Sequence, residues 1–554
     1  MNEEEIKILY SDDKSKVSQI LDSFLKNNED VFIFPELSKN NHRLMLWDVL
    51  FRHIQEKSSE HLHGSCLSAL RILSRDKSEV DVLICEKWII TLIEKAGLYN
   101  FLNIDDESLP AEIIPKKEEA VEALKCLCNL ALNSEVARAL CAHTAIAQGL
   151  VARLRSYKET PYKDDIMLLD MKLLFILTAL RQDITSKIKT DLHGMDYLIS
   201  CTNEIVLEAS LTSDTAGASM SGAETGEDHH CYLHDNQHAI VCEILKIQFN
   251  LTLQSSADEQ VDEAEEAMYL KLMPILTTLL SAHASSEQKL MELRSNIVNL
   301  LLSVPLKFYP FLTPQINEGE KSQCMYDGKN MDALQSLIQF LMYRLTVTTS
   351  TKNQYENLSP ILTVLNKSAR SCRAHRKYLR QEVLPPLRDV SRPPEKGSTL
   401  RNQLCRLLTT PVTSIRDLVA EFLFILCKEK VGRMVKYTGF GNAAGHLAQK
   451  GLLAGGRGNV EYSSSSEDSD TEEYLEAQPH IDPVVGCTRP PRINPFEGMT
   501  EEQKEYEAMK LVNLFDKMVS KGVVKPARVG ADGRPQPVEH VLEMREHPPN
   551  RPQS

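Results

Sequence analysis

The sequence predicts an all-α protein, an armadillo/HEAT-like helical repeat superhelix with a mostly irregular acidic C-terminal extension ending in an amphipathic helix. Apolar residues recur at spacings of three and four almost everywhere up to about residue 435, for example at Leu173, Leu174, Leu177 and Leu180. This spacing lines one face of a helix, whereas the alternation typical of strands is nearly absent. Leu and Ala dominate the apolar set and favour helix.

The repeat prediction depends on helices that resemble one another. Three of them place an Asn inside an apolar stretch, at Asn129, Asn250 and Asn299. The spacing from Asn250 to Asn299 is near the ~40–47 residues of armadillo or HEAT units. Because a buried amide must be hydrogen-bonded, each Asn is expected to bond a neighbouring repeat or to face a peptide in the concave groove. Both roles can hold at one position.

Charge and composition exclude several classes of function. The 554 residues include 77 acids and 63 bases, a net charge of −14, whereas nucleic-acid binding needs a basic surface. No apolar run approaches the ~18–20 residues that span a bilayer, so no transmembrane segment is expected. The thirteen Cys show no C-x-x-C spacing, and the acidic N-terminus does not resemble a secretory signal. We therefore expect a cytoplasmic protein.

The composition changes after residue 435, where glycines crowd together and an acidic, serine-rich tract and a Pro-rich linker follow. Gly, Pro and Ser at this density interrupt helices. The expected segments are a repeat superhelix over 1–435, a Gly-rich segment over 436–460, an acidic tract and linker over 461–499, an amphipathic helix over 500–524 and a disordered tail over 525–554.

The acidic tract EYSSSSEDSDTEEYLEA is typical of substrates of acid-directed protein kinases. Ser464 and Ser469 each have an acid three residues later, and Thr471 is flanked by acids. Each phosphate would add about −1.5 to −2 charges. The sequence predicts phosphorylation at Ser464, Ser469 and Thr471; the alternative is an unmodified acidic spacer.

A basic cluster could receive these phosphates. At helical spacing Arg373, Arg376 or Lys377, and Arg380 share one face, and guanidinium groups bind phosphate through paired donors. We define Arg373, Arg376, Lys377 and Arg380 as the basic cluster. The hypothesis is that the phosphorylated tract docks on it and orders the C-terminal segment; the alternative is an ordinary solvated face.

The last predicted helix begins at a capping box formed by Thr500 and Gln503. Leu511, Phe515 and Met518 lie on one apolar stripe. Because the helix follows a long linker, it could bind a partner, or it could pack on the array.

Two other patterns contain residue types that small-ligand sites use. The cluster of His229, His230, Cys231, His234 and His238 has zinc-compatible spacing but no second ligand pair, so no metal is expected. GFGNAAG resembles a dinucleotide glycine pattern, yet it follows a helix and no βαβ unit surrounds it. No cofactor and no covalent catalysis are expected.

Several blocks of the sequence resemble the synembryn family, over about residues 67–519. The Gly block followed by the acidic tract is the most specific of them. The blocks are RILSRDK from Arg71, LKCLCN from Leu124, VLPPLRDV from Val383, AEFLFILCKE from Ala420, KYTGFGNAAG from Lys436, SDTEEY from Ser469 and GMTEEQKEYEAMKLV from Gly498.

The resemblance implies a non-receptor guanine-nucleotide exchange factor and folding chaperone for G-protein α subunits. Synembryns bind the GDP-loaded or newly made α subunit, take its C-terminal helix in the concave groove, promote GDP release and hold the nucleotide-free state until GTP binds. The groove positions correspond here to Arg71, Arg75 and Asn129, and the family's phosphorylation falls in the acidic tract. A monomer is expected, recruited to the cell cortex or plasma membrane through its partner. The alternative is a generic armadillo-repeat adaptor or scaffold without exchange activity.

Overall fold

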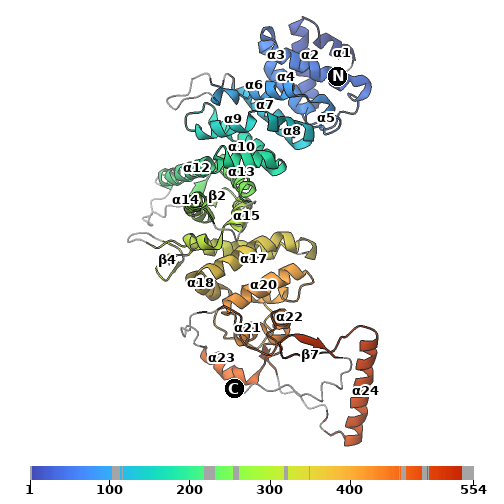
Figure 1. The fold of residues 1–554 in the computed structure, drawn as a ribbon, viewed down its shortest axis with the longest axis vertical. Helices are drawn as coiled ribbons and strands as arrows, with labels where there is room; N and C mark the ends of the chain where they lie inside the picture. The colour runs from blue at the N-terminus through green and yellow to red at the C-terminus, as the bar shows by residue number, and fades with distance from the viewer. Residues whose placement is uncertain are drawn as a thin grey trace. The chain divides into compact units, whose positions relative to one another are not determined.

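The computed structural model describes residues 3–102, 113–114, 116–217, 231–253, 261–316, 322–348, 350–460, 462, 470–489, 496 and 498–538. The chain forms two compact units, Met1–Leu312 and Thr313–Ser554. The regular structure of both is mainly helical (Figure 1), which confirms the all-α prediction. No helix among these residues is both long enough and apolar enough to cross a bilayer.

The first unit is an array of stacked helices in which α4, α7, α10, α13 and α15 pack against one another in that order (Figure 1). Short strands β1 (Tyr232–Leu233) and β2 (His283–Ala284) pair in parallel. The helices are α1 Glu3–Leu9, α2 Lys14–Asn28, α3 His42–Gln55, α4 His63–Leu73, α5 Val80–Leu83, α6 Glu86–Lys95, α7 Lys117–Asn133, α8 Glu135–His143, α9 Ile146–Arg155, α10 Lys163–Leu180, α11 Gln182–Thr190, α12 Gly194–Gly217, α13 Asp235–Thr252, α14 Glu263–Leu280 and α15 Glu287–Ser303.

The second unit continues the helical pattern, and α17 packs on both α16 and α20. Its strands form the antiparallel hairpins β3–β4 (Met325–Tyr326, Lys329–Asn330), β5–β6 (Ile481–Asp482, Cys487–Thr488) and β7–β8 (Ala527–Val529, Pro535–Pro537). The helices are α16 Asp332–Val347, α17 Gln354–Ser371, α18 Arg373–Val383, α19 Leu400–Leu407, α20 Thr413–Leu426, α21 Val431–Thr438, α22 Phe440–Lys450, α23 Glu472–Ala477 and α24 Glu501–Ser520.

Two of the three asparagines picked out in the sequence, Asn129 and Asn250, bond neighbouring helices of the stack. The Asn129 amide of α7 donates to the carbonyl of Arg71 at 3.1 Å and to the hydroxyl of Ser74 at 3.0 Å. The Asn250 amide of α13 donates to the hydroxyl of Thr178 on α10 at 3.1 Å. Burying such an amide without a hydrogen bond would be costly. Here the amide instead joins one helical layer to the next.

A charged pair is completely buried in the first unit. Arg153 donates to both carboxylate oxygens of Asp170, at 2.8 and 2.5 Å, and to the carbonyl of Ala96 at 2.7 Å. Tyr157 donates to the same carboxylate at 2.6 Å, and burial raises the pKa of Tyr157 well above its usual value. Arg153 and Asp170 have no exposed surface, so each depends on the other for compensation.

The C-terminal part contains more structure than the composition indicates. Helix α22 occupies much of the Gly-rich segment 436–460, and Gly439 precedes it with φ 75°, a conformation that favours glycine. The amides of Phe440 and Gly441 bond the carbonyls of Pro483 and Val484, so the β5–β6 turn caps α22. Hairpin β7–β8 lies within the segment expected to be disordered.

We predict that Asp170→Asn lowers the stability of the array by about 3–5 kcal/mol, because it leaves the Arg153 charge buried without compensation. The matched variant Asp183→Asn removes a carboxylate from an exposed pair with Arg181 and should cost less than about 1 kcal/mol. Urea unfolding of both variants measures the difference. Equal losses would contradict the dependence on burial.

Candidate functional site

The candidate site lies at the end of α4, where a turn follows the helix. Arg71 lies in the last turn of α4, and Arg75 lies just beyond it. Helix α7 reaches this turn through two amides. Asn129 bonds the carbonyl of Arg71, and Asn133 bonds the carbonyls of Ser74 at 3.0 Å and Arg75 at 3.4 Å. The structure thus brings Arg71, Arg75 and Asn129 together at one turn.

Arg71 is paired within the protein. Its Nε donates to the carboxylate of Glu122 at 2.5 Å, and Lys125 contacts the same carboxyl group at 2.9 Å. Burial alone would raise the pKa of Glu122, but the hydrogen bonds from Lys125 and Arg71 outweigh it and hold that pKa below its usual value. The charge of Arg71 is therefore largely balanced before any ligand arrives.

Arg75 is held differently, because no carboxylate faces its guanidinium at ion-pair distance in the described structure. The guanidinium lies over the ring of Phe32, 5.2 Å from the ring centre, and donates to the carbonyl of Glu29 at 2.5 Å. Burial, followed by the nearby charge of Arg71, lowers the pKa of Arg75 from its usual value. An incoming carboxylate would relieve this repulsion and accept paired hydrogen bonds.

The ring of Phe32 lies beside Arg75, and two further exposed apolar residues are sequence neighbours of its contacts. Phe32 and Ile33 are 63% and 68% exposed, although their neighbour Phe34 is buried. Leu132, which precedes Asn133 on α7, is 59% exposed. Exposed apolar side chains beside a guanidinium suit a ligand that carries both an anionic end and apolar side chains.

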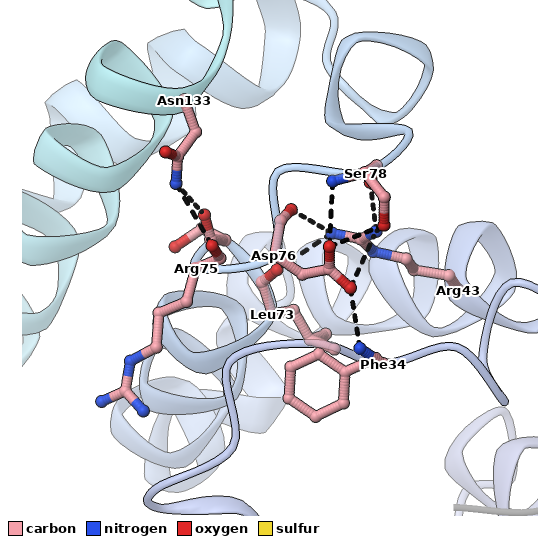
Figure 2. Close-up of polar contacts among 8 residues, drawn as sticks. Phe34, Arg43, Leu73, Arg75, Asp76, Ser78 and Asn133 are labelled. Atoms are coloured by element: carbon pink, nitrogen blue, oxygen red, sulfur yellow. Dashed lines mark hydrogen bonds and ion pairs between the residues drawn. The ribbon is translucent and has the colours of Figure 1, made fainter.

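A buried charged side chain that was not predicted from the sequence, Arg43, contacts this turn. Figure 2 shows Arg43 of α3 reaching the turn, with the Arg75 side chain pointing away from it. Arg43 is 1% exposed and donates to the carbonyls of Leu73 at 3.1 Å and Asp76 at 2.7 Å, and also to that of Ser78. The sequence carried one signal for this group. The charged residue Arg43 stands at the start of an otherwise apolar stripe that continues with Leu46, Trp47 and Leu50.

The basic cluster of α18 is split between two environments. Arg376 lies over the ring of Tyr462, 4.6 Å from its centre, and the Tyr462 hydroxyl donates to Glu429 at 2.9 Å. Lys377 and Arg380 instead line a cavity of about 160 Å³. Arg373 begins α18. Arg376 and the pair Lys377 and Arg380 therefore have different surroundings.

Lys436 joins Lys377 and Arg380 at this cavity, although the sequence analysis did not name it as a phosphate ligand. Its ammonium group pairs with Asp470 and lies 4.2 Å from the ring centre of Tyr474. No local pattern could have revealed this cation, because it comes from a different helix.

Of the predicted phosphorylation sites, Ser464 and Ser469 lie outside the described residues. The Thr471 hydroxyl donates to the carbonyl of Leu387 and accepts from the amide of Tyr474 at 3.2 Å, so it caps α23. Thr471 lies at the edge of the cavity, because Asp470, which precedes it, lines that cavity.

Helix α24 begins at the predicted capping box, in which Thr500 and Gln503 exchange hydrogen bonds. None of its residues is buried; Leu511 is 61% and Phe515 37% exposed, and Met518 is half-buried. Its apolar stripe is thus not covered by other described residues. An unpacked apolar stripe favours partner binding.

The patterns weighed for small ligands have ordinary structural roles where they are described. His229 and His230 lie outside the described residues, and the ring of His238 bonds the Lys289 carbonyl at 2.8 Å. Among the residues that the structure describes, no group of three or more His, Cys, Asp or Glu could hold a metal ion. The GFGNAAG block spans the start of α22 and follows a helix, as expected.

Comparison with known proteins agrees with this architecture and with the sequence resemblance. The chain is 40% identical to "Chaperone Ric-8A" of Xenopus tropicalis over 542 residues, 97% of this chain and 95% of the relative. It is 37% identical to "Chaperone Ric-8" of Drosophila melanogaster over 591 residues, 99% of this chain and 98% of the relative.

The fold is similar to that of a solved structure described as "A conserved phosphorylation switch controls the interaction between cadherin and beta-catenin in vitro and in vivo". The TM-score is 0.50 at 13% identity, with 83% of this chain and 72% of that chain covered. This likeness concerns the armadillo-like fold alone. A family model described as "Guanine nucleotide exchange factor synembryn" matches residues 66–534, and the chain therefore belongs to the synembryn family.

Proposed function

We propose that this protein is a guanine-nucleotide exchange factor and folding chaperone for G-protein α subunits, without covalent chemistry of its own. Membership of the synembryn family and the relatives named as chaperones support this role. The observation that carries the proposal is Arg75, a guanidinium at the end of α4 that lies over the exposed ring of Phe32. It matches the carboxylate that ends the C-terminal helix of an α subunit.

The two arginines would act in sequence at this site. Arg75 can accept a carboxylate at once, because only a carbonyl and a ring hold it. Arg71 must first share or release Glu122, at a cost that offsets part of its new interaction. Asn129 keeps the backbone of Arg71 in place and has two of its hydrogen bonds committed there. Arg75 therefore supplies most of the initial attraction.

Exchange follows from binding one conformation of the partner more tightly than another. An α subunit whose last helix is held in the groove loses support for its nucleotide site, so GDP leaves. Binding only the nucleotide-free state stabilises that state by mass action, which also describes a chaperone. No residue of this chain needs to contact the nucleotide.

Helix α24 would provide a second contact on the same partner. Leu511, Phe515 and Met518 present an apolar stripe that stays unpacked in the described structure. Two surfaces on one chain raise the effective concentration of each for the partner. The nucleotide-free α subunit exposes apolar surface that such a stripe can cover.

Phosphorylation of Ser464, Ser469 and Thr471 by an acid-directed kinase would regulate the C-terminal segment. Lys377, Arg380 and Lys436 gather cationic groups at one cavity, next to Asp470. Tyr462 and Asp470, on either side of the serines, are both fixed on basic side chains, Arg376 and Lys436. A phosphate at this place would gain charge-assisted hydrogen bonds. We also propose a cytoplasmic monomer that its partner recruits to the cell cortex or plasma membrane.

We predict that Arg75→Ala slows stimulated GDP release and weakens α-subunit binding about 10–100-fold, because one charge-assisted contact is lost. Arg181→Ala, which removes an arginine from an exposed pair elsewhere, should change neither. Fluorescent-nucleotide release measures both variants. Undiminished stimulation of an α subunit that lacks its last residues would refute capture at the groove, and a generic adaptor role would then be favoured.

We predict that Leu511→Asp combined with Phe515→Asp weakens α-subunit binding at least about tenfold, since apolar burial at the interface is lost. The thermal unfolding midpoint should not change, because neither side chain is buried in the free protein. Asn513→Asp, a polar position of the same helix, is the control. Calorimetric titration decides, and unchanged affinity of the double variant would remove α24 from the interface.

We predict that treatment with an acid-directed kinase slows hydrogen exchange over residues 470–489, and that Lys377→Glu with Arg380→Glu abolishes this slowing. Lys396→Glu reverses an exposed charge in the same unit and should leave the slowing intact. Mass spectrometry of the exchanged peptides gives the comparison. The same slowing in the double variant would show that the phosphates dock elsewhere or act only through net charge.

A further inference from the structure

We propose that Arg43 is a positioning residue for the candidate site. Through its buried guanidinium it fixes the turn that carries Arg75, and through Asp76 it fixes the segment that carries Phe32 and Ile33. Together these would form an end-reading subsite for a peptide that terminates in a free carboxylate behind an apolar side chain. The inference rests on the proposed function, and it adds the group that sets the geometry of the site.

Arg43 holds the backbone at the end of α4 and in the turn after it. Arg43 approaches from α3 and donates to the carbonyls of three residues, Leu73, Asp76 and Ser78. Leu73 ends α4 and the other two lie in the turn that follows, so one side chain bonds the backbone on both sides of the point where it leaves the helix. A guanidinium suits this task because its donors diverge in a rigid plane; a lysine ammonium cannot reproduce that fork.

Asp76 links Arg43 to the segment next to Arg75. The Asp76 carboxylate lies 3.6 Å from the Arg43 guanidinium, and both side chains are almost fully buried. Asp76 accepts the amide of Phe34 at 2.7 Å and both the amide and the hydroxyl of Ser78. Burial would raise the pKa of Asp76, but these hydrogen bonds, the Ser78 hydroxyl first, hold it below the usual value.

The bonds of Arg43 and Asp76 extend to the exposed side of the turn through Phe34. Phe34 is buried, whereas Phe32 and Ile33 project into solvent, and the Phe32 ring lies under the Arg75 guanidinium. On the other side of the turn, Asn133 bonds the carbonyl of Arg75 (Figure 2). The segment of Phe32 and Ile33 is therefore held through Asp76, whereas the turn that carries Arg75 is held by Arg43 from one side and by Asn133 from the other.

The bonds of Arg43 differ from those of Arg153, a second buried arginine of the first unit. Arg153 is equally buried and also bonds a carbonyl, yet its other donors go to the carboxylate of Asp170 within the helical stack. Every identified donor bond of Arg43 goes to residues 73–78, the end of α4 and the turn that carries Arg75. Arg153 is therefore a matched control for the loss of a buried arginine.

The first experiment needs no ligand. Hydrogen exchange in the full chain is compared for wild type, Arg43→Lys and Arg153→Lys. Arg43→Lys should raise exchange at least about fivefold over residues 31–37 and 74–79, and Arg153→Lys should not. Protection equal to wild type in these segments would overturn the positioning role. If Arg43→Lys does not fold, Asp76→Asn tests the same bonds through the Phe34 amide.

The second experiment uses two synthetic peptides of the last α-subunit residues, one with a free carboxylate and one with an amidated end. Wild type should prefer the free carboxylate about tenfold, the size of one charge-assisted contact. Arg43→Lys should reduce this preference to less than about threefold, whereas Arg153→Lys should keep it. Fluorescence anisotropy measures all affinities.

The outcomes separate the two proposals. If Arg43→Lys weakens both peptides equally and keeps the tenfold preference, Arg43 is only structural and the inference fails. If wild type binds both peptides equally while Arg43→Lys still loosens residues 31–37 and 74–79, carboxylate capture fails and the end-reading subsite fails with it. The loosened segments would then show that the failure lies in the proposed function and not in the bonds of Arg43.

Discussion

The carbonyl groups at the C-terminal end of each helix need hydrogen-bond donors. The donors that bond the last carbonyls of α4 shape the candidate site of this protein. The last four carbonyls of a helix have no intrahelical donor. Here the amides of Ser74, Arg75 and Asp76 bond the carbonyls of Leu70, Ile72 and Leu73. Asn129 bonds the carbonyl of Arg71 from the next layer, and Arg43 adds a second donor at Leu73. The tight turn that results places Arg75 at the surface.

The fold could be predicted from the sequence because it depends on local periodicity. Spacings of three and four define amphipathic helices, and their repetition implies a stack. Asn129 could also be predicted, because a lone amide in an apolar helix must bond something. The hairpin β7–β8 could not be expected from composition, since Pro and Gly are typical both of disorder and of tight turns.

The candidate site was only partly visible in the sequence, because its geometry is set by residues distant along the chain. The Arg43 side chain bonds carbonyls thirty or more positions away, and its charge interrupts an apolar stripe that otherwise indicates plain core. Lys436 meets Lys377 and Arg380 only in the folded unit. Arg373 and Arg376, by contrast, matched the helical spacing but do not line that cavity. Spacing identifies a shared face, not the element that packs on it.

A turn fixed from two sides has a consequence for when a client can be recognised. If Arg75 binds a terminal carboxylate, the site reads a chemical group that a polypeptide gains only on release from the ribosome. A chain still in synthesis, or an internal apolar segment of an unrelated unfolded protein, offers no such anion. The rigid placement of Arg75 over Phe32 would thus select completed translation products and spare the chaperone from occupation by unfinished ones.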